Sequence, residues 1–312
     1  MLIEALSMLV IGLALLLIGS NFLVTSTENF SDTFSISGFI ASFFMIGIAT
    51  SAPEIFVSIV SAIQNQTILA IGNTLGSNIS NIALVFCVSV LFIRKNHQKI
   101  TLPKEAFIGM SLLTLITLIV IIYDNLLDGI DSLFLIVAFV YALMILDKDT
   151  DYSSFEPHTK KNKTTTMSIV FYSIAGLVML IYGSDYFITG ATNIALIFGV
   201  STYVIGLTLT ALGTSLPELA TTIQSARKGR SDFIVGNIIG SNIFNLGIAL
   251  AIAGLISPAL INESEFIRDI CMLIFSMIIF YFIIKSDKSS IKTVYSSLLI
   301  VTYLLYVILL LS

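Results

Sequence analysis

Long apolar stretches separated by short polar connections dominate the sequence. Ten of these stretches have about the 20 residues that a helix needs to cross a hydrocarbon layer of about 30 Å. They cover residues 2–25, 37–64, 67–93, 106–123, 127–146, 167–195, 201–226, 233–257, 266–284 and 293–311. The pattern predicts an all-α membrane protein with ten transmembrane helices.

A polar stretch, 147–166, interrupts the apolar pattern near its middle and leaves five spans on each side. We interpret it as a solvated linker between a first half, 1–146, and a second half, 167–312. Because five is odd, the second half enters the membrane from the opposite side. The two halves are therefore predicted to form inverted-topology repeats.

Basic residues are concentrated in every second loop between the predicted spans. Of the 15 Lys and Arg residues, 14 follow spans three, five, seven and nine, and Arg268 alone lies on the other side. Short cytoplasmic loops are enriched in Lys and Arg, so both termini are predicted to face outside and the linker to lie in the cytoplasm. The N-terminal stretch has no basic region or cleavage site, which favours a retained first span over a signal peptide.

Composition supports a membrane protein and disfavours other classes. Hydrophobic residues make up 56% of the 312 residues and charged residues only 11%, against roughly a quarter charged in soluble proteins. Much of the surface is thus expected to contact membrane lipid. A net charge of −4 gives no indication of nucleic-acid binding. The sequence has no HExxH motif, no paired intramembrane Asp and no nucleophile with a base, so we do not expect an enzyme.

One stretch occurs twice. Residues 47–84 and 211–248 align without a gap at an offset of 164, and 14 of the 35 positions from Thr50 to Leu84 are identical. The identities are mostly polar or helix-breaking residues, which chance in so apolar a sequence would not select. They include Thr50/Thr214, Ser51/Ser215, Pro53/Pro217, Glu54/Glu218, Gly72/Gly236, Gly76/Gly240, Ser77/Ser241 and Asn81/Asn245.

The repeated prolines and glycines predict irregular helices. Pro53 and Pro217 lie inside the second and seventh spans, and a proline leaves the carbonyl four residues earlier without its donor. The repeated glycines fall inside the third and eighth spans. We therefore predict that helices 2, 3, 7 and 8 are broken, and such breaks are tolerated in membranes where they line a site.

The repeated carboxylates point to cation binding. An ionisable group at mid-membrane costs at least about 2.5 kcal/mol, and apart from Arg268 at the edge of the ninth span no Lys or Arg lies within a span to pair with Glu54 or Glu218. A mobile cation is the natural partner; the alternative is a protonated structural carboxyl. Thr50 and Glu54 are four residues apart, as are Ser77 and Asn81, so each pair shares a helical face. Only oxygen ligands are present, which favours calcium or sodium over zinc or copper.

The motifs ATSAPE (49–54) and GTSLPE (213–218), each followed by GNxxGSNIxN, resemble the alpha repeats of sodium/calcium exchangers in the cation/calcium exchanger superfamily, most of all its compact prokaryotic members. The resemblance implies a prokaryotic inner-membrane antiporter that needs no cofactor and functions as a monomer. It implies that Glu54 and Glu218 are the central ligands and that spans one and six slide across the other helices. The further ligands it implies are Thr50, Ser51, Ser77, Asn81, Thr214, Ser215, Ser241 and the carbonyls near Gly47 and Ala211.

Asn245 departs from this pattern, because compact exchangers commonly carry Asp at its position. Asn keeps an oxygen ligand but cannot ionise, so the expected site carries a charge of −2 from two carboxylates. That charge matches one calcium ion or two sodium ions. The departure leaves the number of sodium ions per cycle open.

Three transport functions are compatible with these residues. We expect calcium to be exchanged for sodium by alternating access. A calcium/proton antiporter of the same superfamily would use the same carboxylates, although such relatives more often carry a GNxxE type of repeat. A cation channel would place acidic side chains in a ring. Two inverted repeats with one internal carboxylate each fit a closed, alternately exposed site better than a pore.

Overall fold

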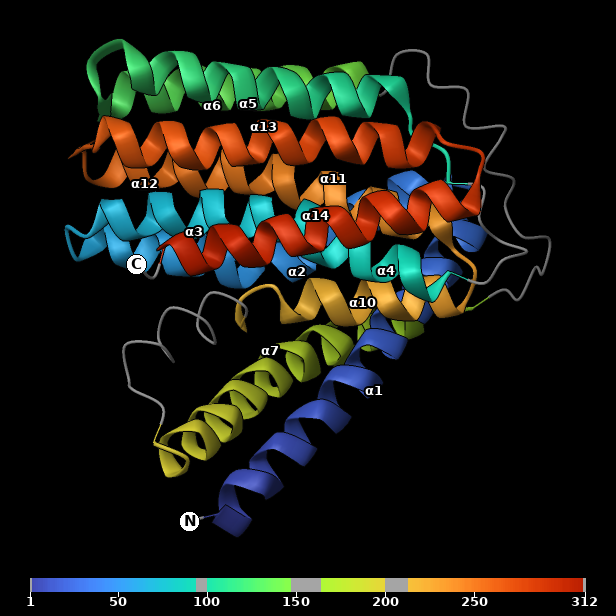
Figure 1. Ribbon diagram of the computed structural model, residues 1–312. Coiled ribbons are helices and arrows are strands. Elements are labelled where there is room, and N and C mark those ends of the chain that lie inside the picture. The colour runs from blue at the N-terminus through green and yellow to red at the C-terminus, as the bar shows by residue number, and fades with distance from the viewer. Residues whose placement is uncertain (1, 94–99, 147–163, 200–212, 311–312) are drawn as a thin grey trace.

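The computed structural model describes residues 2–93, 100–146, 164–199 and 213–310. Within these ranges the protein is almost entirely helical (Figure 1). Nine described spans are long and apolar enough to cross a membrane. They confirm nine of the ten predicted spans, and the remaining one, 201–226, begins among residues outside the description.

The first half comprises α1 (Leu2–Phe34), α2 (Gly38–Ile63), α3 (Thr67–Ser80), the π-helical segment η1 (Asn81–Phe86), α4 (Cys87–Phe92), α5 (Lys104–Asp124), β1 (Leu126–Leu127) and α6 (Gly129–Leu146). The second half comprises α7 (Thr166–Ile197), α10 (Leu216–Arg227), α11 (Ser231–Phe244), the π-helical segment η5 (Asn245–Leu250), α12 (Ala251–Ile256), β2 (Ala259–Leu260), α13 (Glu263–Lys285) and α14 (Ser289–Leu310). The two strands pair antiparallel over two residues each and join the α5–α6 connection to the α12–α13 connection.

Helices α1 and α7 form a long pair that leans away from the other helices (Figure 1). Glycines let their backbones touch: a Cβ on Gly176 would lie 2.8 Å from the backbone N of Leu23, and one on Gly183 would lie 2.9 Å from the N of Leu16. Small residues at such crossings are typical of helix pairs in membranes. Sequence-distant helices, one from each half, thus pack as one unit.

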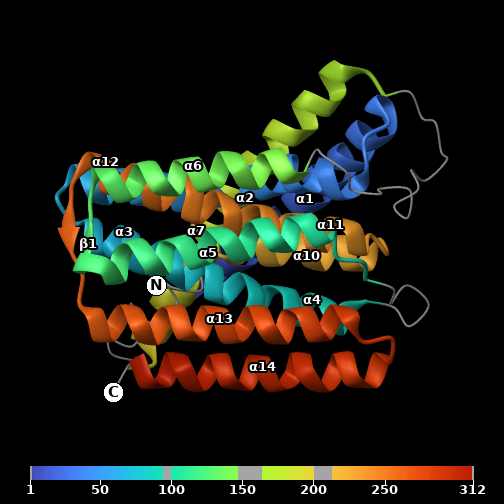
Figure 2. The same ribbon diagram turned by 90° about the horizontal axis from the view of Figure 1, so that it is seen from above.

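The remaining helices form a bundle around α2, α3 and α11. Figure 2 shows α13 and α14 side by side along one edge of this bundle. Its core is aromatic and aliphatic, with Phe39, Phe43, Phe86 and Phe280 fully buried. The bundle therefore holds its central polar residues away from lipid.

The repeat in the sequence is also a repeat of structure. Helices α3, η1 and α4 together span Thr67–Phe92, and α11, η5 and α12 span Ser231–Ile256, with every boundary shifted by 164. Both copies change from α- to π-helix at the repeated asparagines, Asn81 and Asn245. Such π segments widen one turn and are frequent at functional sites.

The structure does not show the predicted breaks at Pro53 in helix 2 or at the glycines of helices 3 and 8. Helix α2 continues through Pro53, because a proline removes one backbone bond while the packed turns on either side remain intact. The glycines of the third and eighth spans also lie within regular helix, since an interior glycine costs only about 1 kcal/mol. In the seventh span, α10 begins at Leu216 after a turn at Thr214 and Ser215, with Pro217 in its first turn.

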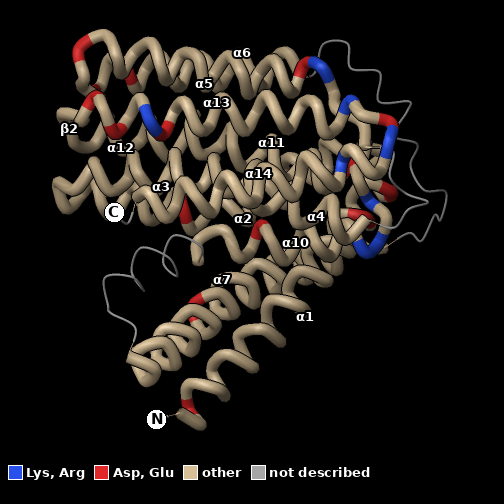
Figure 3. The backbone as a smooth tube through the Cα atoms, in the orientation of Figure 1, with Lys and Arg blue, Asp and Glu red and all other residues tan. Residues whose placement is uncertain are grey.

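Charged residues are distributed unevenly between the two ends of the helices. Figure 3 shows Lys and Arg gathered mainly at one end, while several Asp and Glu residues lie at the other. The basic end includes the α10–α11 turn, where Lys228 Nζ lies 2.7 Å from Glu28 of α1. The opposite end carries the β1–β2 pair.

Candidate ion-binding site

Two carboxyl groups lie buried in the middle of the bundle. Glu54 projects from α2 and Glu218 from the first turn of α10, and both side chains are 0% exposed. The Ser77 hydroxyl of α3 donates to Glu54 Oε1 over 3.5 Å. The two carboxyls are close enough to repel one another when both are ionised. In the described part of the chain, no Lys or Arg forms an ion pair with either.

Buried oxygens without a hydrogen-bond partner are concentrated in the two repeated stretches that carry these carboxyls. Within the described ranges they include Glu54 Oε2, both carboxylate oxygens of Glu218, Ser51 Oγ and the amide oxygens of Asn81, Asn242 and Asn245. Leaving one buried polar atom unpaired costs about 1–3 kcal/mol, so such a concentration needs a compensating partner. Carboxylate, hydroxyl and amide oxygens are the ligands of hard cations.

Asparagines connect α3 of the first half to α11 and η5 of the second half. Asn245 donates its amide to Asn78 Oδ1 over 3.1 Å, and Asn78 donates to the backbone carbonyl of Asn242, also over 3.1 Å. The bond to Asn78 leaves Asn245 Oδ1 as the atom free to bind a ligand. Asn81, its repeat counterpart, has neither amide atom bonded within the described chain.

A second polar group joins α2 to α11. The Thr50 hydroxyl donates to Asn237 Oδ1 over 3.1 Å and lies 3.3 Å from Ser241 Oγ. Ser241 in turn donates to the Gly47 carbonyl over 3.4 Å. The backbones are close here, since a Cβ on Gly47 would lie 3.2 Å from the Cα of Gly240. The structure thus brings Thr50, Ser241 and Gly47 together, with their polar atoms bonded to one another.

The remaining predicted site residues, Ser215, Thr214 and Ala211, differ in their surroundings. Ser215 is buried and its hydroxyl lies 2.6 Å from Ser80 Oγ, which ties the start of α10 to α3. Thr214 lies in the turn just before α10 and is half-buried. Ala211 lies outside the described residues.

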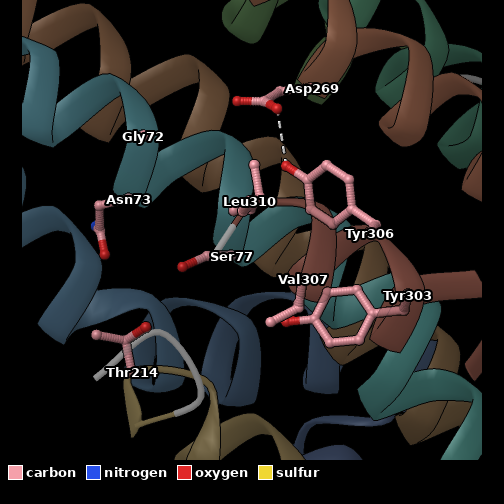
Figure 4. Close-up of a pocket in the computed structure, with 10 residues that line it drawn as sticks. Gly72, Asn73, Ser77, Thr214, Asp269, Tyr303, Tyr306, Val307 and Leu310 are labelled. Carbon is pink, nitrogen blue, oxygen red and sulfur yellow. Dashed lines mark hydrogen bonds between the residues drawn. The ribbon is translucent and has the colours of Figure 1, made fainter. Parts of the chain in front are cut away.

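A cavity of about 220 Å³ opens beside the carboxyls (Figure 4). One wall is the face of α3 from Gly72 to Ser77, and Thr214 lies opposite. Asp269 of α13 and the last turns of α14, from Tyr303 to Leu310, complete it. Ser77 therefore contacts Glu54 on one side and the cavity on the other.

A family model described as sodium/calcium exchanger protein matches residues 4–146 and 168–312. The chain belongs to the sodium/calcium exchanger protein family. Inner membrane protein YrbG of Escherichia coli is 32% identical to this exchanger-family chain, over 88% of this chain and 87% of its own. Sodium/calcium exchanger MaX1 of Methanosarcina acetivorans is 26% identical, over 88% of this chain and 90% of its own.

Solved structures of exchangers share the fold. The sodium-calcium exchanger NCX_Mj soaked with Na⁺ and Sr²⁺ superposes with a TM-score of 0.79 at 28% identity, covering 98% of both chains. The same exchanger soaked with neither Na⁺ nor Ca²⁺ gives a TM-score of 0.79 over 99% of this chain. The all-helical membrane architecture of this family member is thus that of a sodium-calcium exchanger.

Equivalent residues of the two repeated stretches have different surroundings in this family member. Thr50 and Ser241 are 0% exposed and contact each other, whereas their repeat counterparts, Thr214 and Ser77, line the open cavity. The Thr50 side of the site is thus covered, whereas the cavity on the Thr214 side extends to Ser77, whose hydroxyl donates to Glu54.

Sequence reasoning underestimated or missed several residues of the site. Asn78, Asn237 and Asn242 form the polar connections, and their recurrence at the offset of 164 was the available signal. Ser80 has no serine counterpart, since Phe244 occupies its repeat position. Asp269 and Tyr306 lie outside the repeated stretch, so no pattern in the sequence connected them with Glu54.

Proposed function

We propose that this protein is a secondary antiporter that exchanges calcium for sodium by alternating access at the site around Glu54 and Glu218. The observation that carries the proposal is the set of unpaired buried oxygens in both repeated stretches, which include oxygens of two carboxyls with no basic partner among the described residues. Membership of the exchanger family and the name of the relative MaX1 support the choice of ions.

The two carboxylates supply a charge of −2, and a cation between them replaces their mutual repulsion with attraction. Asn81, Asn245 and Ser51 offer further unpaired buried oxygens from the same repeated stretches. Calcium takes six to eight oxygen ligands, so hydroxyls and backbone carbonyls would complete its coordination. We assign this supporting role to Thr50, Ser77, Thr214, Ser215, Ser241 and the carbonyls of Gly47 and Ala211.

The proposal includes an inverted architecture with repeats 1–146 and 167–312, joined by the linker 147–166. The separate matches of the family model to 4–146 and 168–312 support this division. The basic residues at one end of the helices support a cytoplasmic location for that end and an outside location for both termini. The protein would thus be a multi-pass protein of the prokaryotic inner membrane, active as a monomer.

Alternating access requires a second state in which the Thr50 side of the site is open and the Thr214 side is covered. In the other state, Thr214 and Ser77 would contact each other as Thr50 and Ser241 do here, and the cavity would open beside Thr50. The α1–α7 pair is the natural moving part, because its glycine-lined interface holds the two helices together while most of its length leans away from the bundle.

The test is calcium uptake into proteoliposomes, comparing an imposed sodium gradient with an imposed pH gradient. We expect uptake to follow the sodium gradient and to be lost in the Glu54→Gln variant. Uptake driven by the pH gradient alone would establish a calcium/proton antiporter instead. Uptake that needs neither gradient and follows the calcium gradient passively would establish a channel.

A further inference from the structure

The cavity beside the ion site has a charged group in its wall that belongs to neither repeated motif. Tyr306 of α14 donates its hydroxyl to Asp269 Oδ1 over 2.9 Å. Arg268 donates its Nε to the same oxygen over 2.7 Å. Figure 4 shows the Asp269 carboxyl at the cavity, with Tyr306 beside it.

One carboxylate oxygen of Asp269, a residue that lines the cavity, takes part in neither of these bonds. The bonds from Tyr306 and Arg268 both end on Oδ1, and the other oxygen points away from Tyr306 in Figure 4. The Asp269 side chain is 18% exposed, whereas Arg268 is 43% exposed and so more accessible to solvent. The carboxylate is thus held in place by the phenol while its neighbour partly offsets its charge.

The cavity connects this carboxylate to the ion site. Asp269 and Ser77 line the same cavity of about 220 Å³, and the Ser77 hydroxyl donates to Glu54 Oε1. Val307 and Leu310 make much of the remaining wall apolar. A charge lining a cleft with low-dielectric walls acts over a longer distance than the same charge on an open surface.

We propose that Asp269 attracts cations into the cavity that leads to Glu54 and Glu218, that Arg268 weakens this attraction, and that Tyr306 positions the carboxylate. The proposal rests on the proposed function, because it assigns a path to that site. It differs from a purely structural role, in which Asp269 would serve only to hold α14 against α13 through Tyr306.

The directions in which two substitutions change the apparent KM for calcium separate these two roles. Asp269→Asn removes the charge but keeps an oxygen that accepts from Tyr306, so the apparent KM for calcium should rise by up to about 10-fold while the maximal rate is unchanged. Arg268→Gln leaves the carboxylate without its cationic neighbour, so KM should fall. A structural role predicts that both substitutions impair transport in the same direction.

Glu265→Gln is the matched control, because Glu265 is an exposed carboxylate of the same helix that does not line the cavity. It should leave KM unchanged. Salt should raise the KM of the unsubstituted protein more than that of Asp269→Asn, since screening acts on the attraction that the substitution removes. An equal shift in Glu265→Gln would show a general surface-charge effect and overturn the proposal.

A second measurement does not depend on transport. In a Cys87→Ala, Cys271→Ala background, a cysteine introduced by Val307→Cys lies in the cavity wall, and its labelling rates with cationic and anionic thiol reagents report the local potential. The cationic preference should fall in Asp269→Asn and rise in Arg268→Gln. If neither substitution changes the preference for the cationic over the anionic reagent, the proposal about Asp269 is overturned. If both substitutions change this preference as expected but the protein shows no sodium-driven calcium uptake, the proposed function is overturned instead.

Discussion

At the scale of single residues, the most important feature is the burial of two carboxyls, neither of which has a basic partner within the described chain. Glu54 has one oxygen bonded to Ser77 and one unpaired, while both oxygens of Glu218 are unpaired. A buried ionised carboxylate without compensation is strongly unfavourable, so each needs a cation or a proton. These two residues should therefore dominate ion binding.

Glu54→Gln and Glu218→Gln should each abolish calcium exchange and leave a folded protein. Gln keeps the side-chain volume and removes the charge, so ion attraction is lost while no desolvation cost is added. Thr50→Ala should be milder, because the Thr50 hydroxyl already bonds to Asn237. Uptake assays on protein that elutes as a single species would check this, and transport near the normal rate in either Gln variant would mean that the site is wrongly placed.

Asn245→Asp should remain active near neutral pH and gain a pH dependence that the unsubstituted protein lacks. The Asn245 amide donates to Asn78, and a carboxylate cannot donate, so the new group would be protonated or would need the Asn78 amide to rotate. Protons and calcium then compete for the added carboxyl, and apparent calcium affinity should rise with pH. Flux from about pH 6 to about pH 9 decides this. Superimposable profiles would show that residue 245 does not face the ions.

At the scale of helices, equivalent glycines in the two repeats meet different neighbours. A Cβ on Gly240 of α11 would lie 2.7 Å from the Phe43 carbonyl of α2, whereas a Cβ on its counterpart, Gly76 of α3, would meet nothing within 4 Å. The α2–α11 contact is thus a backbone contact that needs glycine. The matching face of α3 borders the cavity instead.

Gly240→Ala should lower the thermal stability of the purified protein, by about 1–3 kcal/mol, because the added methyl overpacks a backbone contact. Gly76→Ala is its matched control and should leave stability nearly unchanged, since its methyl points into open space. Thermal unfolding in detergent measures both. Equal losses in the two variants would contradict the asymmetry between the covered and open sides.

At the scale of the whole molecule, the charge distribution relates the fold to the membrane. The α10–α11 turn carries Lys228 and Arg230, and the α13–α14 connection carries Lys288, all at the basic end seen in Figure 3. From the positive-inside rule we predict that this end faces the cytoplasm. The cavity, bordered by the last turns of α14, would then open to the outside.

Cysteines replacing Ser289 and Ser264, in a background without Cys87 and Cys271, should react with an impermeant reagent from opposite sides of the membrane. Ser289 begins α14 at the basic end, and Ser264 lies in the first turn of α13 at the acidic end. Ser264→Cys should be labelled in intact cells and Ser289→Cys only after the membrane is opened. Labelling of Ser289→Cys in intact cells would reverse the assignment.

The sequence alone determined the membrane class, nine of the spans now described and the repeat that contains both carboxyls, because hydropathy and residue identity at a constant offset are properties of the chain itself. It predicted breaks at Pro53 and the glycines that the packed helices do not show, since neighbouring helices decide whether an irregular turn stays helical. Only tertiary structure decided that Thr50 is covered by Ser241 while Thr214 faces a cavity, and that Asp269 lies near Ser77. These outcomes depend on contacts between residues far apart in the chain, and two copies of one motif can differ in them because each packs against different neighbours.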